Sequence, residues 1–155
     1  MSQKRTDVVE VEVRIAARPE TIFPFFTDPK KMVKWKGVKA ELEPKPGGRY
    51  RVDINGRDIA NGTFVQLEPF KRIVYTWGWE GEGSPVPPGS STVEVTLIPD
   101  GKTTIVRLRY YDLPEPARET HKEGWKHYLG RLIEAGEGRD PGVDPMTMPA
   151  PKKGS

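Results

Sequence analysis

The longest helical pattern in the sequence is HKEGWKHYLGRLI, which runs from His121 to Ile133. Apolar and small residues recur there at steps of three and four, a spacing that places them on one side of a helix. These residues are Gly124, Trp125, Tyr128, Leu129, Leu132 and Ile133. Most of the charge falls on the other side, at Lys122, Glu123, Lys126 and Arg131. A wide apolar stripe of this kind needs one broad partner surface.

Most of the chain before this helix alternates apolar and polar residues, which is typical of strands buried on one face. The dipeptides Asn55-Gly56 and Asp100-Gly101 supply tight turns for hairpins. Strands are expected at residues 9–15, 38–43, 50–54, 59–67, 72–79, 92–99 and 103–111. About six or seven strands joined mostly by hairpins predict a mainly antiparallel, curved sheet wrapped around the long C-terminal helix. Helices gathered on one face of such a sheet define the α+β class.

Prolines and an aspartate predict two short helices after the first strand. Pro19 suits a first helical turn, because its missing N–H would be unpaired there. Asp28 followed by Pro29 forms a second start signal, with Asp28 as the N-cap. Gly62 lies inside an expected strand and indicates a bulge or the close approach of another backbone.

The long helix has boundary signals of its own. Pro114 and Pro116 are expected to open it, and Gly136 or Gly138 to end it. One domain is expected over residues 8–136, with flexible termini at 1–7 and 137–155. The loop at 80–91 is rich in Gly and Pro, and its composition suggests control of entry to a cavity.

Composition narrows the class of protein. The chain has 155 residues, no cysteine, a formal charge of +3 and a sequence pI of about 9.1. Without cysteine there is no disulfide, no thiolate nucleophile and no thiolate metal site. No apolar run reaches the roughly 20 residues of a membrane span, and residues 1–7 lack the apolar core expected of a signal peptide. A soluble, cytoplasmic protein is expected.

The positive charge has one local concentration, at Lys30, Lys31, Lys34, Lys36 and Lys39. A nucleic-acid binder usually gathers more cations on one face. Most charge runs are solvated helix faces, and this one is interpreted in the same way. It is also the one sequence feature that hints at a protein partner.

Several short motifs suggest a known family. They are Thr27-Asp28-Pro29 with Trp35, Pro46-Gly47-Gly48-Arg49-Tyr50, Gly62-Thr63-Phe64-Val65-Gln66-Leu67-Glu68-Pro69, Arg72-Ile73-Val74-Tyr75-Thr76-Trp77, Thr104-Ile105-Val106-Arg107-Leu108, and His121-Lys122-Glu123-Gly124-Trp125 with Leu129 and Leu132. In order and spacing they resemble the activator of Hsp90 ATPase homologue 1-like family. That family lies in the helix-grip (SRPBCC) superfamily, with START lipid-transfer domains, Bet v 1-type allergens and polyketide cyclases.

The resemblance implies a single-domain, bacterial-type member with a cavity between the curved sheet and the long helix. Two departures affect what it implies for function. A position that is often His in the family is Tyr110 here. The full eukaryotic Hsp90 activator also carries a separate N-terminal domain, for which this chain has no room.

Aromatic residues from separate elements are the candidate ligand-binding set, because this fold would bring them together. With one histidine they are Trp35, Tyr50, Phe64, Trp77, Tyr110, His121, Trp125 and Tyr128. An apolar pocket with a few polar tips would orient a ligand. The alternative is an ordinary aromatic core, which is the usual place for large rings such as Phe64 and Trp77.

His121 is the candidate for acid–base chemistry, since an imidazole titrates near neutral pH. A single His at a helix start is more often structural, so no catalytic residue is assigned. His127 lies six residues further along the helix, and the two side chains point in different directions. Two histidines and no cysteine predict no metal site and no cofactor.

The predicted function is binding of a small apolar or amphipathic ligand between sheet and helix. One alternative is a co-chaperone-like module of the Hsp90-activator type, with a chaperone or another protein as partner. The other is an enzyme of cyclase or hydrolase type that uses the same pocket. No nucleic-acid or membrane partner is expected, and the protein could be a monomer or a homodimer.

Overall fold

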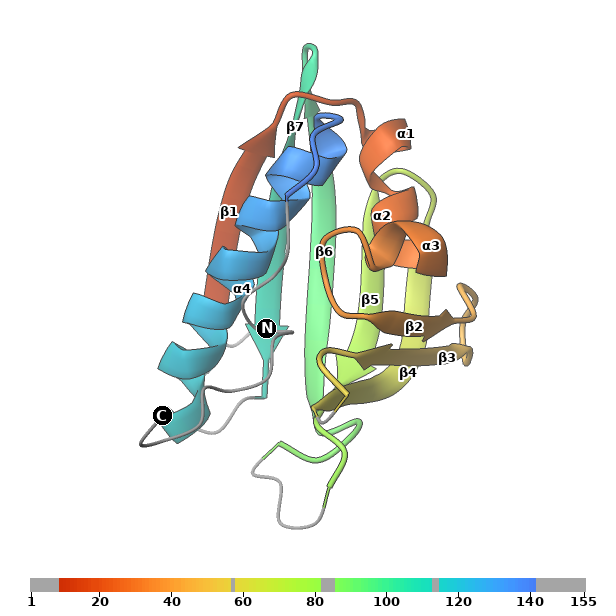
Figure 1. Ribbon diagram of the computed structural model, residues 1–155, viewed down its shortest axis with the longest axis vertical. Helices are drawn as coiled ribbons and strands as arrows, with labels where there is room; N and C mark the ends of the chain where they lie inside the picture. Colours follow the sequence, from red (N-terminus) through yellow and green to blue (C-terminus); the bar gives the residue numbers. More distant parts are fainter. Residues whose placement is uncertain (1–8, 57, 82–85, 113–114, 142–155) are drawn as a thin grey trace, which may run out of the picture.

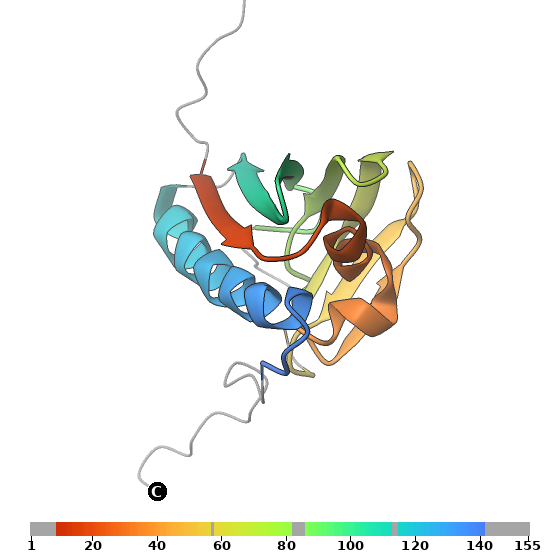
Figure 2. The same ribbon diagram turned by 90° about the horizontal axis from the view of Figure 1, so that it is seen from above.

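A seven-stranded antiparallel sheet curves around one long helix and three one-turn helices (Figure 1, Figure 2). The computed structural model describes residues 9–56, 58–81, 86–112 and 115–141, without the side chains of residues 115–117 and 120. The sheet order is β1-β7-β6-β5-β4-β3-β2. All helices lie on its concave side, so the expected helix-grip architecture of the α+β class is confirmed.

The strands follow the alternation of the sequence closely. They are β1 (Val9–Ile15), β2 (Lys39–Leu42), β3 (Arg49–Asp53), β4 (Ile59–Glu68), β5 (Arg72–Trp77), β6 (Ser91–Asp100) and β7 (Thr103–Tyr111). In β7 every second residue is buried against the helices. The other face is wet and carries cross-strand ion pairs such as Arg109–Glu10 and Arg107–Glu12, both at 2.8 Å. The outer face is therefore charged, and the core lies on one side of the sheet only.

The segment after β1 differs from the expectation in one respect. It contains three one-turn helices, α1 (Pro19–Ile22), α2 (Pro24–Thr27) and α3 (Pro29–Met32), where two were expected. Pro24 is the reason, because a residue without an N–H starts a new turn and cannot continue the old one. The Asp28 cap is confirmed, since its carboxylate accepts a hydrogen bond from the Lys30 amide at 2.9 Å.

The long helix α4 (Glu115–Gly136) crosses the concave face of the sheet beside β1 (Figure 1). Trp125, Tyr128, Leu129 and Leu132 are buried, as the stripe predicted. Each such side chain contributes about 2 kcal/mol by leaving water. Arg131 was expected on the charged, outer side of the helix. Its guanidinium instead donates a hydrogen bond to the Trp35 carbonyl at 3.0 Å.

Of the two glycines expected to end α4, Gly138 is the one that caps the helix. It has a positive φ of 87°, and the Arg139 amide that follows it donates to the Glu134 carbonyl at 2.7 Å. This 6→1 bond is the signature of a glycine-capped helix end. Gly136 is instead the last residue of the helix and packs against Ile15 of β1.

Gly62 marks a close backbone approach, as its position inside a strand predicted. A Cβ at Gly62 would lie 1.8 Å from the Thr76 carbonyl oxygen of β5. The Thr76 hydroxyl accepts a hydrogen bond from the Thr63 amide at 2.9 Å, and the β4–β5 register shifts between Phe64 and Gln66. The sheet can bend sharply here because a glycine leaves the room.

Two expectations fall partly outside the described residues. Residues 1–8 and 142–155 are not described, so the flexible termini stay a prediction. In the loop after β5, residues 82–85 are not described, while Val86 is buried and its carbonyl accepts from the Trp79 amide at 2.6 Å. Among the described helices, none has both the length and the apolar character needed to cross a membrane.

Candidate functional site

A cavity of about 200 Å³ lies between α4 and the ends of β3 and β5. Four segments line it, and the lining residues are Lys36, Ile54, Asn55, Asp58, Trp77, Trp79, His121, Gly124, Trp125 and Tyr128. The wall is mainly aromatic. The segments are far apart in sequence, so the cavity exists only because the sheet curls around the helix.

Lys36 is the unexpected member of this wall. It lies between α3 and β2, and only 3% of its surface is exposed. Its ammonium nitrogen lies 3.9 Å from the centre of the Trp125 ring and 5.8 Å from that of Tyr128. Burial lowers the pKa of Lys36 to about 7. The interpretation of the whole Lys30–Lys39 run as a solvated face is therefore wrong for Lys36.

His121 occupies the same cavity but has both ring nitrogens engaged. The Trp79 indole N–H can only donate, and it lies 3.4 Å from Nε2. Nε2 is therefore the acceptor, and Nδ1 carries the proton and donates to the Tyr110 hydroxyl oxygen at 3.3 Å. Burial, with a smaller contribution from the Lys36 charge, lowers the pKa of His121 to about 4. The imidazole is neutral at pH 7 and is held in one tautomer.

In an NMR pH titration, the Cε1–H signal of His121 should stay at its neutral position down to about pH 5. The physical reason is that protonation would place a charge in a half-buried site next to Lys36. A midpoint near the ordinary value of about 6.5 would show that the imidazole is open to water and would contradict this geometry.

Two residues that line the cavity, Trp77 and Lys36, carry donor groups with few or no partners among the described residues. Trp77 is 2% exposed, and its indole N–H has no hydrogen-bond partner within the described part of the chain. Lys36 likewise has no carboxylate partner among the described residues, and burial is the sole cause of its lowered pKa. A buried donor without an acceptor costs free energy, so a bound acceptor would be stabilised here.

The structure brings together half of the ligand-binding residues expected from sequence. Trp77, His121, Trp125 and Tyr128 line the cavity. Tyr110 stands directly behind them, with its ring centre 5.5 Å from that of Trp77. Burial raises the pKa of the Tyr110 hydroxyl, so it stays protonated as a partner of His121.

The remaining three residues lie elsewhere in the core. Tyr50 stacks on Tyr75 with ring centres 4.1 Å apart, and Phe64 packs edge-on against both rings. Trp35 packs against Phe26 and donates its indole N–H to the Phe25 carbonyl at 2.9 Å. A role for Trp35, Tyr50 and Phe64 in ligand binding stays a prediction.

Sequence reasoning missed Lys36, Ile54, Gly124 and the turn residues Asn55 and Asp58 as parts of the wall. Trp79 shares the alternation of Trp77 and was expected among the converging aromatic residues, but it is not one of the eight predicted ligand-binding residues. The ring centres of Trp77 and Trp79 lie 4.6 Å apart. For Lys36 no local signal separates a covered lysine from its solvated neighbours.

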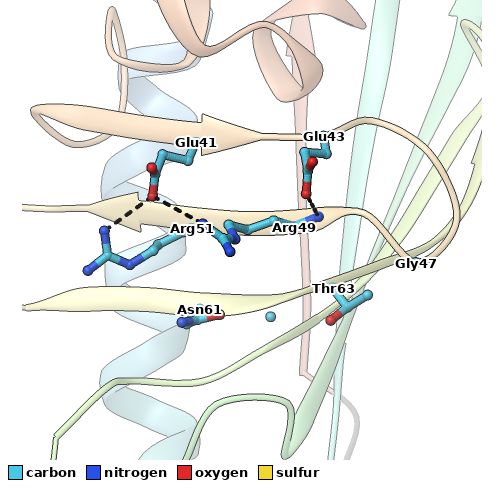
Figure 3. Close-up of a pocket in the computed structure, with 8 residues that line it drawn as sticks. Glu41, Glu43, Gly47, Arg49, Arg51, Asn61 and Thr63 are labelled. Carbon is cyan, nitrogen blue, oxygen red and sulfur yellow. Dashed lines mark hydrogen bonds and ion pairs between the residues drawn. The ribbon is translucent and has the colours of Figure 1, made fainter.

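A second, larger depression of about 610 Å³ is open and polar (Figure 3). It runs over β2, β3 and β4, and Glu41, Glu43, Arg49 and Arg51 line it. Its charges are compensated locally: Arg51 lies 3.3 Å from Glu41 and 2.9 Å from Glu80. Because these groups already have partners, this groove is a weaker candidate for a ligand site than the aromatic cavity.

No cluster of three or more potential metal ligands occurs among the described residues.

A curved antiparallel sheet that holds a long C-terminal helix over an internal cavity defines the helix-grip class of proteins. The family model described as "Activator of Hsp90 ATPase homolog 1-like protein" matches residues 16–137. The chain therefore belongs to the Activator of Hsp90 ATPase homolog 1-like family. A comparison with curated proteins found no match.

Solved structures support this assignment. The AHSA1-like protein RHE_CH02687 from Rhizobium etli is 44% identical, with a TM-score of 0.71, over 94% of this chain and 91% of that one. DynU16, a protein of the dynemicin biosynthetic locus, is 25% identical over 87% of this chain with a TM-score of 0.75, and this chain spans 49% of it. PFC0360w, an Hsp90 activator from Plasmodium falciparum, is 23% identical over 81% of this chain and 92% of that one, with a TM-score of 0.67, and shows the shared fold alone.

Proposed function

We propose that the protein binds a small apolar or amphipathic ligand in the cavity between the sheet and α4. The observation that carries this proposal is an aromatic wall that includes the buried Trp77 indole N–H, which lacks an acceptor among the described residues. Lys36 lies in the same wall and has no carboxylate partner among those residues. A packed core would leave neither the space nor the unused indole N–H.

The volume limits the size of the ligand. A dry apolar cavity of about 150 Å³ is large enough to bind benzene, whereas drug-sized ligands occupy about 300 Å³ or more. At about 200 Å³, this cavity suits a single ring with a small substituent. A long acyl chain does not fit the cavity at that volume.

The polar groups limit the chemistry of the ligand. Trp77 offers an N–H, Lys36 offers its amine or ammonium, and the accepting nitrogen of His121 is already occupied by Trp79. A ligand that accepts hydrogen bonds, through a carbonyl, ether or carboxylate oxygen, would pair with these donors. Its ring would lie against Trp77, Trp79 and Trp125.

Small ring compounds such as indole and benzyl alcohol provide a direct test. The protein has four tryptophans, each with a separate indole N–H signal in a nitrogen–proton correlation spectrum. Titration should shift the signals of Trp77, Trp79 and Trp125. The signal of Trp35 should stay in place, because its N–H is bonded to the Phe25 carbonyl away from the cavity. Native mass spectrometry of the purified protein would show any ligand that co-purifies.

Two glycines of α4 provide a matched pair of variants. A Cβ at Gly124 or at Gly130 meets no heavy atom within 4 Å, but Gly124 lines the cavity and Gly130 is exposed. Gly124→Leu should weaken binding of the ring compounds at least tenfold, and Gly130→Leu should leave it unchanged. Both changes improve helix propensity by about 1 kcal/mol, so both variants should fold. Equal binding by the two variants would remove this cavity as the site.

The same residues give less support to the two alternative functions, an enzyme and a co-chaperone. An acid–base role for His121 is disfavoured by its lowered pKa and by its two engaged nitrogens. A co-chaperone role would need an exposed apolar patch, whereas the large exposed apolar residues of the described chain, Val38, Val65 and Phe70, come from three segments. Absence of ring binding together with capture of a chaperone would favour the co-chaperone function.

A further inference from the structure

Lys36 is held in one place by its neighbours along the chain. Its backbone amide donates to the Met32 carbonyl at 2.9 Å, and Arg131 of α4 donates to the carbonyl of Trp35, the residue before it, at 3.0 Å. The side chain then runs into the cavity, where its nitrogen lies 3.9 Å from the Trp125 ring centre. The fold therefore fixes the amine against the Trp125 ring in the wall of the cavity.

The surroundings of the amine lack a counter-charge. The titratable groups that share the cavity wall are Asp58, His121 and Tyr128. The Asp58 carboxylate is exposed and accepts a hydrogen bond from the Asn55 amide at 2.9 Å, and His121 is neutral at pH 7. The Trp125 face favours the ammonium form, but ring contacts are weaker than the cost of burying an unpaired charge. The neutral amine is therefore well populated near neutral pH.

The fraction of neutral amine at pH 7 is far larger for Lys36 than for an unperturbed lysine. With a pKa of about 7, about half of the Lys36 amines are neutral at pH 7. An unperturbed lysine, with a pKa of about 10.4, is neutral in only about one molecule in 2,500 at that pH. A neutral amine in an apolar pocket is a nucleophile, and desolvated lysines of this kind form Schiff bases with carbonyl compounds.

We infer that Lys36 captures a carbonyl ligand, an aldehyde or ketone attached to a single apolar ring, as an imine inside the cavity. This inference rests on the proposed ligand-binding function and names the class of ligand. The nitrogen lone pair attacks the carbonyl carbon, and the C=O π electrons move to oxygen to give a carbinolamine. Loss of that oxygen as water, with the two protons of the amine, leaves the C=N bond. The step is a condensation and needs no oxidant or reductant.

The test uses the full-length protein and benzaldehyde at pH 7, with sodium cyanoborohydride added to trap any imine as a stable secondary amine. Peptide mapping by mass spectrometry then locates the label. Lys36 should be labelled on the order of 100-fold faster than the other lysines, since its neutral fraction exceeds the reference value for a lysine by more than that factor. Lys39, exposed and three residues further on, is the internal comparison.

Variants separate the cavity from the amine. Gly124→Leu should reduce labelling of Lys36 at least tenfold without touching the lysine, and Gly130→Leu should not. Formaldehyde, which has no ring, should label Lys36 in the wild type and in both glycine variants. Lys36→Met removes the label at this position and serves as the blank.

The outcomes distinguish this inference from the function on which it rests. Labelling of Lys36 no faster than Lys39, while indole still shifts the signals of Trp77 and Trp125, would overturn the carbonyl chemistry and keep the cavity. No labelling and no shift would overturn both. Fast labelling that Gly124→Leu does not reduce would show a reactive surface amine and would overturn capture inside the cavity.

Discussion

Gly62→Ala is expected to lower the free energy of unfolding by about 4 kcal/mol or more, one of the two largest effects we predict. The added Cβ would lie 1.8 Å from the carbonyl oxygen of Thr76 and 2.4 Å from its carbonyl carbon. Both atoms belong to the backbone of β5, so no side-chain rotation can relieve the clash. The strands β4 and β5 would have to separate at this point. Overpacking typically costs about 1 to 3 kcal/mol, and a larger loss is expected here because the clash is with backbone that cannot rotate away.

Urea denaturation of the two proteins at 25 °C measures this loss. Gly130→Ala is the control, because a Cβ there meets no atom within 4 Å and Gly130 lies in a helix. That change should raise the free energy of unfolding by up to about 1 kcal/mol. A loss below about 1 kcal/mol for Gly62→Ala would mean that β4 and β5 do not approach each other this closely.

Lys36→Met is expected to stabilise the protein at pH 7 and to change how stability depends on pH. Below about pH 7, Lys36 is charged in both the folded and the unfolded state, and folding carries the full cost of burying that charge. Between about pH 7 and 10, the unfolded chain still binds the proton and the folded protein does not. Wild-type stability therefore rises with pH over this window, since the unfolded state binds more protons.

The difference in free energy of unfolding between Lys36→Met and the wild type should narrow by about 4 kcal/mol as the pH rises from 7 to 10. Each pH unit in this window corresponds to about 1.4 kcal/mol. The buried tyrosines lower stability in alkali, but they are present in both proteins and cancel in the difference. His121 titrates below the window.

Urea denaturation of both proteins at pH 7, 8, 9 and 10 gives the gap directly. Lys39→Met, at an exposed position, controls for the general effect of removing one positive charge. A gap that stays constant with pH would show that Lys36 is charged throughout and that its nitrogen reaches water. The same result would weaken the case for carbonyl capture.

The elements of the fold could be read from local sequence because their causes are local. The period-two pattern of β6 and β7 and the turn at Asp100-Gly101 place the hairpin that the structure contains. The apolar stripe of α4 likewise depends only on residue spacing. The third one-turn helix was missed although its signal is also local: it begins at Pro24, a residue that favours the first turn of a helix.

The candidate site was only partly readable for a different reason. Trp77, Trp125 and Tyr128 were expected because aromatic residues on the inner faces of this fold converge. Tyr50 and Phe64 satisfy the same pattern, yet they fill a packed cluster with Tyr75. Alternation shows which face a side chain occupies. It does not show whether that part of the face meets a neighbour or a void.

The sequence by itself determined the strands, the gripping helix and the family, because periodicity, turn chemistry and motif order are properties of neighbouring residues. Only the tertiary structure decided that a cavity remains, and that Lys36 rather than Lys34 or Lys39 lies inside it. The burial of Lys36 depends on α4 covering it with Trp125, about ninety residues further along the chain. A lysine carries the same local pattern whether it is covered or solvated, so the burial on which the proposed function rests arises from packing between distant segments.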